Sequence, residues 1–69
     1  MTLSNQIKQE REREGLSQAR LARLMGVSLG TVKSWEAAPE LEYARTPQPS
    51  KLKTMNLIYG RDIKWIAKS

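Results

Sequence analysis

The side chains of this sequence that could do chemistry are cations and short polar groups. Histidine and cysteine are both absent, so neither a nucleophile–base pair nor the usual zinc ligand sets can be assembled. A glycine-rich phosphate loop is also absent, and the acidic residues lie mostly in one charge-alternating stretch. The composition therefore predicts a binding protein rather than an enzyme, with no cofactor and no metal.

Positive charge is unevenly distributed along the chain. The chain carries 12 Lys and Arg against 7 Asp and Glu, which gives a net charge of +5. Residues 1–44 hold six basic and six acidic side chains, so the excess falls in residues 45–69, with six basic side chains and one acidic. Such an excess suggests an anionic partner, although a merely solvated, charged surface is almost as good an explanation of charge alone.

Short polar residues gather on one face of the segment 28–36. At a helical period, Val32 and Trp35 turn inward, and the opposite face carries small side chains and one cation: Ser28, Gly30, Lys33 and Ser34. A helix that meets only solvent usually carries more long charged residues, whereas a helix laid against base edges can use short ones. A plain helical hairpin with no ligand is the alternative.

Helices must position these groups, and the sequence predicts four or five short helices and no strand. We expect a single all-α domain over 1–69. The predicted helices cover Thr2 or Ser4 to Glu14, Gln18 to Met25 after a Ser17 cap, Ser28 to about Ala37, Lys51 to Tyr59 after a Ser50 cap, and Ile63 to Lys68 after an Asp62 cap. The predicted buried residues are Leu3, Ile7, Leu21, Ala22, Met25, Val32, Trp35, Leu52, Met55 and Ile66.

The second and third predicted helices are joined by the tight link Gly26-Val27-Ser28, as in a helix-turn-helix unit. Ala22 suits a close approach of the two helices, and Gly26 suits the reversal of the chain. Over residues 16–36 the chain resembles the family of phage Cro proteins and repressors, and the likeness extends loosely over about residues 3–66. The resemblance implies a compact bundle with the lambda-repressor-like fold.

The resemblance also implies roles for individual residues. Residues implied to read DNA bases are Ser28, Leu29, Gly30, Lys33 and Ser34, and the long stem of Lys33 could reach either a guanine or a phosphate. Residues implied to hold DNA phosphates are Gln18, Thr31, Arg45, Thr46, Gln48, Ser50 and Lys51. Arg11 and Glu36 match a structural ion pair of the family; two unrelated surface charges are the alternative. Because the family often has glutamine where this chain has Leu29 and Gly30, we expect sparse base readout with a contribution from DNA shape.

The implied function is that of a sequence-specific transcriptional regulator, a Cro-type phage repressor. Its implied partners are double-stranded operator DNA and a second copy of the chain, in a weak homodimer through residues 61–65. An antitoxin that binds a toxin protein and its own promoter is the alternative, because the segment 31–36 is also similar to antitoxins. The absence of a signal peptide and of any apolar stretch of about 20 residues predicts no membrane partner and a bacterial cytoplasmic location.

The stretch after the third predicted helix is the longest loop, residues 37–49. It contains Pro39, Pro47 and Pro49, and it is several residues longer than the family's usual loop around residues 37–44. Glu40 and Glu42 would repel phosphate. We therefore expect the insertion to point away from DNA or toward a protein partner.

Overall fold

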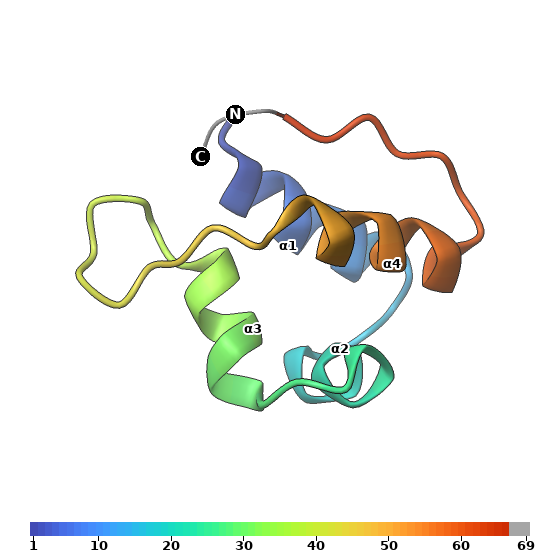
Figure 1. Cartoon of the computed structure of the whole chain (residues 1–69), viewed down its shortest axis with the longest axis horizontal. Helices are drawn as coiled ribbons and strands as arrows, with labels where there is room; N and C mark the ends of the chain where they lie inside the picture. Colours follow the sequence, from blue (N-terminus) through green and yellow to red (C-terminus); the bar gives the residue numbers. More distant parts are fainter. Residues whose placement is uncertain (67–69) are drawn as a thin grey trace.

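Four helices make up most of the computed structural model, which describes residues 1–66 of the chain (Figure 1). Their bounds are α1 Leu3–Arg13, α2 Gln18–Met25, α3 Leu29–Glu36 and α4 Pro49–Tyr59. Over this part of the chain no strand occurs, which confirms the predicted all-α class. None of the helices within these residues has the length and apolar character needed to cross a membrane.

Three of the helices begin after a residue whose side-chain hydroxyl caps the first turn. The side chains of Thr2, Ser17 and Ser28 each accept a hydrogen bond from the backbone N–H three residues later, at 3.0–3.1 Å. Each cap satisfies one of the free N–H groups of the first turn and contributes about 1 kcal/mol. The caps therefore explain why α1, α2 and α3 begin where the sequence predicts.

Helix α4 begins two residues earlier than predicted. Gln48 occupies the N-cap position without a side-chain cap, and Pro49 is the first helical residue. Proline is favoured there because its fixed φ suits a helix and its missing N–H would have no partner. Ser50 is thus inside the first turn, where its backbone carbonyl accepts a hydrogen bond of 3.0 Å from Thr54 Oγ1. The predicted Ser50 cap is wrong.

The link between α2 and α3 is tight because Gly26 reverses the chain. Gly26 has φ of 70°, in the left-handed region that favours glycine. The backbone N–H of Val27 then donates to the carbonyl of Ala22 at 3.0 Å, which closes the end of α2. Ala22 is buried, as expected where α2 and α3 pack closely together. This link sets the angle at which α3 leaves α2.

Eight of the ten residues predicted to be buried lie in the hydrophobic core, which also contains Tyr59 and Ile63. Leu52 and Ile66 are only partly buried and pack against the edge of the core. Helix α4 instead turns Met55 and Tyr59, which are four residues apart on one face, into the core. The buried hydrophobic residues are Leu3, Ile7, Leu21, Ala22, Met25, Val32, Trp35, Met55, Tyr59 and Ile63.

The chain after α4 is extended rather than helical. Gly60 ends α4 with φ of 66°, and the segment then runs back across the molecule toward the start of α1 (Figure 1). The predicted helix from Ile63 to Lys68 is therefore wrong over residues 63–66, and its last residues lie outside the described part. Asp62 caps nothing; its carboxylate accepts from Lys64 Nζ at 2.9 Å.

Side chains from two helices hold this segment, which we call the strap (residues 61–66). The amide of Gln6 donates to the carbonyl of Lys64 at 2.9 Å and accepts from the N–H of Ile66 at 2.8 Å. Asn56 Nδ2 donates to the carbonyl of Ile63 at 3.2 Å, and Asn56 Oδ1 accepts from Trp65 Nε1 at 2.9 Å. Three of these bonds satisfy backbone groups that a helix would satisfy locally, so the strap is stable in the extended form.

Candidate nucleic-acid interface

Helix α3 presents a face of small side chains to its surroundings. Val32 and Trp35 are buried against α1 and α2, while Leu29, Gly30 and Lys33 are exposed. A Cβ added at Gly30 would meet only the hydroxyl of Ser28, at an ordinary 3.8 Å. Packing therefore does not require glycine at this position. Its effect is to leave the backbone of α3 open to close approach from outside.

The hydroxyls of α3 are held within the helix. Ser28 Oγ, besides capping the helix, lies 2.9 Å from Thr31 Oγ1. Ser34 Oγ donates to the carbonyl of Thr31 at 2.6 Å. Because this bond uses the hydroxyl proton of Ser34, the same oxygen is left as an acceptor toward any group outside the protein.

The residues of the predicted ion pair, Arg11 and Glu36, lie in contact. Arg11 Nε and Nη2 donate to the two oxygens of Glu36 at 2.7 and 3.0 Å, and the side chains are only 9% and 3% exposed. Arg11 Nη1 also donates to the carbonyl of Leu16. The hydrogen bond with Glu36 raises the pKa of Arg11 above its ordinary value. This two-pronged contact fixes the end of α3 against α1.

Gln18, predicted to hold a phosphate, is the first residue of α2 and is partly buried. Its Nε2 donates to Glu36 Oε1 at 3.1 Å. Local sequence signals do not indicate this bond, because it depends on how α3 packs against the start of α2. This bond uses one of the two amide hydrogens of Gln18. Because the amide group is held in place, the direction of its second hydrogen is fixed as well.

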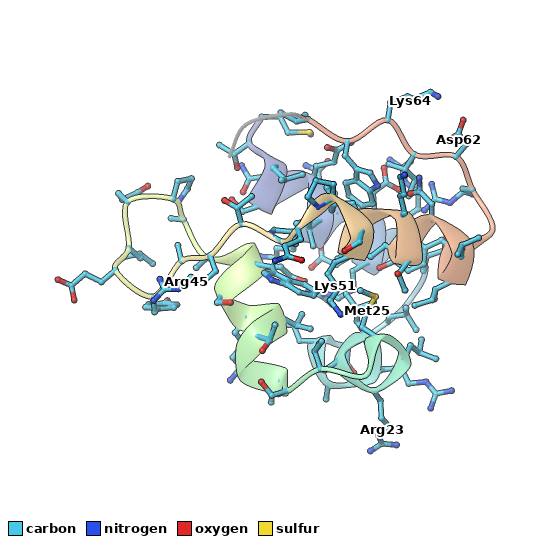
Figure 2. The ribbon with its side chains drawn as sticks, in the orientation of Figure 1. Arg23, Met25, Arg45, Lys51, Asp62 and Lys64 are labelled. Atoms are coloured by element: carbon cyan, nitrogen blue, oxygen red, sulfur yellow. The ribbon has the colours of Figure 1, made fainter. Side chains whose placement is uncertain are left out.

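The loop before α4 is tied back to α3. The backbone N–H of Arg45 donates to the carbonyl of Ser34 at 2.9 Å, and Arg45 Nη1 donates to the carbonyls of Glu42 and Ala44 at 2.8 Å each. In Figure 2 Arg45 and Lys51 lie on opposite sides of α3 in the view. Three further residues predicted to hold phosphates are exposed between or beside them: Thr46, Gln48 and Ser50.

Positive charge is not uniform over the basic part of the chain. Arg61 Nη2 lies 2.8 Å from a carboxylate oxygen of Glu10 and 2.9 Å from one of Glu14, and the bond with Glu10 raises the pKa of Arg61. Lys64 pairs with Asp62. These two cations are therefore matched by acids of the same chain, whereas within residues 1–66 neither Arg45 nor Lys51 forms an ion pair.

Two residues absent from the predicted site also lie beside α3. Lys8 of α1 and Tyr43 of the loop line an open hollow of about 430 Å³ together with Gln18, Lys33, Glu36 and Ala37. Lys8 could have been found from its spacing, since it lies three residues before Arg11 and hence on a neighbouring part of the same helix. Nothing in the loop sequence indicates where Tyr43 lies.

Comparison with protein families gives a match over most of the chain. The model of a family described as helix-turn-helix matches residues 7–66. Searches of curated proteins and of solved structures give no match. The match covers all of α2 and α3 and the Gly26 link between them. The chain therefore belongs to the helix-turn-helix family of the XRE type, the Cro and repressor type, and is a DNA-binding transcriptional regulator.

Proposed function

We propose that this regulator is a Cro-type phage repressor that binds double-stranded operator DNA as a dimer, with α3 in the major groove. The observation that carries the proposal is the exposed face of α3, where Leu29, Gly30 and Lys33 stand outward. Gln18, at the start of α2, lies beside the end of this helix through Glu36. A groove-facing helix next to a helix start is the docking arrangement of helix-turn-helix proteins.

Base contacts follow from the chemistry of this face. Leu29 is 40% exposed and can contact a thymine methyl group. Ser34 Oγ, whose proton is held by Thr31, can accept a hydrogen bond from the amino group of adenine or cytosine. Gly30 allows the backbone close to the bases, so readout there depends on DNA shape. In this arrangement Ser28 borders the bases through its exposed position at the start of α3.

Phosphate contacts follow from the cations and neutral donors around α3. Lys51 and Arg45 supply charge, and the amide of Gln18 supplies a donor fixed by Glu36. Neutral contacts complete the proposed set: Thr31, Thr46, Gln48 and Ser50. Such contacts set the register of the protein on the duplex without reading its sequence.

Dimerisation is proposed because one copy offers little surface for strong specific binding. The strap carries Asp62 and Lys64, whose side chains are 81% and 87% exposed, and Leu57 of α4 is 83% exposed beside it. In a twofold contact the patch on one copy meets the same patch on the other copy. The opposite charges of the two patches can then pair, and their apolar side chains can pack together. We place the dimer contact there and expect it to be weak without DNA.

Selection from random duplexes followed by footprinting tests the proposal. Sedimentation measures the oligomeric state of the chain in the absence of DNA. We expect protection of a near-palindrome whose half-sites lie about one turn, roughly 34 Å, apart. Binding should weaken steeply with salt. Protection of a single half-site with a linear dependence on protein concentration would contradict the dimer. Equal binding to all duplexes would contradict the role as a sequence-specific repressor.

A further inference from the structure

The open hollow beside α3 is assembled from four separate parts of the chain. Its volume is about 430 Å³, and its lining includes Lys8 of α1, Gln18 of α2, Lys33 of α3 and Tyr43 of the loop. Lys33 and Glu36 are three residues apart, so Lys33 lies on the side of α3 nearest to α1 and the start of α2. Ser34 is not part of this lining; its backbone carbonyl accepts from the N–H of Arg45 at 2.9 Å.

The hollow carries net positive charge. Within residues 1–66 neither Lys8 nor Lys33 forms an ion pair, and both are exposed. The single acid of the lining is Glu36, and its two oxygens already accept from Arg11 and Gln18. The negative charge of Glu36 is thus matched inside the protein, and the two lysines leave an unmatched charge of about +2 at the opening.

Tyr43 reaches the hollow because turns shape the loop. Backbone hydrogen bonds of 3.0 Å join Leu41 to Ala38 and Ala44 to Leu41. The guanidinium of Arg45 spans the carbonyls of Glu42 and Ala44, on both sides of Tyr43. The insertion was expected to point away from DNA or toward a protein partner. It places Tyr43, whose phenol is a neutral hydrogen-bond donor, in the lining of the hollow next to α3.

We propose that this hollow is a binding site for the backbone phosphate of the bound duplex, held by Lys8, Lys33 and Tyr43. The inference rests on the proposed placement of α3 in the major groove, since phosphates then pass along the side of α3 that borders the hollow. Gln18 supplies the second neutral donor. Lys33 accordingly contacts phosphate rather than a base, and the inserted loop widens the grip on DNA.

Binding assays on single variants of the full chain test the site. A fluorescently labelled selected duplex and its scrambled version are each titrated at several salt concentrations. Lys8→Ala and Lys33→Ala should each lower the slope of log affinity against log salt by about one unit, equally for both duplexes. Tyr43→Phe should weaken binding about two- to tenfold without changing the slope, because a neutral donor displaces no counterion.

Arg13→Ala is the matched cation control. Arg13 is on the same helix as Lys8, its side chain is 65% exposed, and it lies 3.6 Å from a carboxylate oxygen of Glu10. We expect wild-type affinity and slope from this variant. Thermal melts of every variant are compared with the wild type, and Lys8→Gln replaces Lys8→Ala if the alanine variant does not fold, since glutamine keeps most of the stem.

Two outcomes separate the phosphate site from the function on which it rests. If Lys8→Ala and Tyr43→Phe bind as the wild type does while Lys51→Ala weakens binding, phosphate does not enter the hollow and the inference is wrong. If the wild-type chain distinguishes no duplex and shows no salt dependence, the proposed function itself fails. Relaxed base preference in Lys33→Ala, with an unchanged slope, would return Lys33 to the base-reading set and overturn its assignment here.

Discussion

Gln18 donates a hydrogen bond of 3.1 Å to Glu36, which joins the first residue of α2 to the last residue of α3. The same carboxylate binds Arg11 of α1. One acidic side chain thus holds three helices, and the Gly26 link closes the other end of the α2–α3 unit. Orientation of α3 relative to the start of α2 therefore depends on a buried polar contact as well as on apolar packing.

Removing Glu36 should strongly destabilise the protein. Glu36→Ala leaves Arg11, whose side chain is 9% exposed, as a buried charge without its partner, and we expect a loss of about 3–5 kcal/mol in the free energy of unfolding. Urea denaturation measures the change. Asp62→Ala, which breaks the exposed pair with Lys64, is the control and should cost less than about 1 kcal/mol. Equal losses in the two variants would show that the buried pair has no special role.

The hydroxyl of Tyr59 should make stability fall at high pH. Burial raises the pKa of Tyr59 to about 12, from about 10 in the unfolded chain. The neutral form is therefore favoured by folding: its contribution is fully present below pH 10 and is lost as the pH rises through 12, by at most about 1.4 kcal/mol per unit. Chemical denaturation between pH 9 and about 12 follows the loss.

Tyr59→Phe should remove this part of the pH dependence. Within the described residues the buried hydroxyl of Tyr59 has no hydrogen-bond partner. The phenylalanine variant should thus be at least as stable near pH 7, because an unpaired buried hydroxyl costs about 1–3 kcal/mol. Tyr43→Phe, at an exposed position, serves as the matched control and should keep the wild-type pH profile. Identical profiles in both variants would assign the effect elsewhere.

A charge at Val32 should unfold the chain. Val32 is completely buried, and Val32→Asp would place a carboxylate among apolar side chains in a small domain of low stability. Circular dichroism should show loss of helix at room temperature. The neighbouring exposed position provides the control: Lys33→Asp should retain the helical spectrum. A cooperative melt of Val32→Asp like that of the wild type would refute the placement of α3.

Contacts to bases and to phosphates should differ in their dependence on salt. Lys51→Ala should weaken selected and scrambled duplexes by similar factors and lower the salt slope by about one unit. Ser34→Ala removes an acceptor, so it should leave the slope unchanged and reduce discrimination at one base pair by about 1–3 kcal/mol. Titrations of both duplexes at several salt concentrations decide the matter. Identical behaviour of the two variants would mean that α3 does not enter the groove.

Local signals predicted the part of the fold that carries the helix-turn-helix. Thr2, Ser17 and Ser28 act within three residues of themselves, so their caps can be recognised without the tertiary structure. The strap could not be predicted, because one of the two side chains that hold it, Gln6, lies 58 and 60 residues away from its partners. At the start of α4 two local signals competed, and Pro49 outweighed Ser50.

Some features of the candidate site also follow from local sequence signals, whereas others depend on the tertiary structure. Exposure of Leu29, Gly30 and Lys33 follows from the helical period that buries Val32 and Trp35. The pairing of distant charges such as Arg11 and Glu36 can be predicted from a family pattern or seen in the fold, but not from local sequence signals. The positions of Lys8 and Tyr43 beside α3 depend on how a loop and three helices meet, for which the sequence holds no short-range signal.

The Gln6 clamp on the strap also bears on the order of folding. Closing a loop of 58 or 60 residues costs about 3.6 kcal/mol of chain entropy, whereas each helix closes only four-residue turns. The helices and their apolar contacts should therefore form first, and the strap should dock afterwards, on the downhill side of the folding barrier. Substitutions in the clamp, such as Gln6→Ala, should then accelerate unfolding and leave the folding rate nearly unchanged.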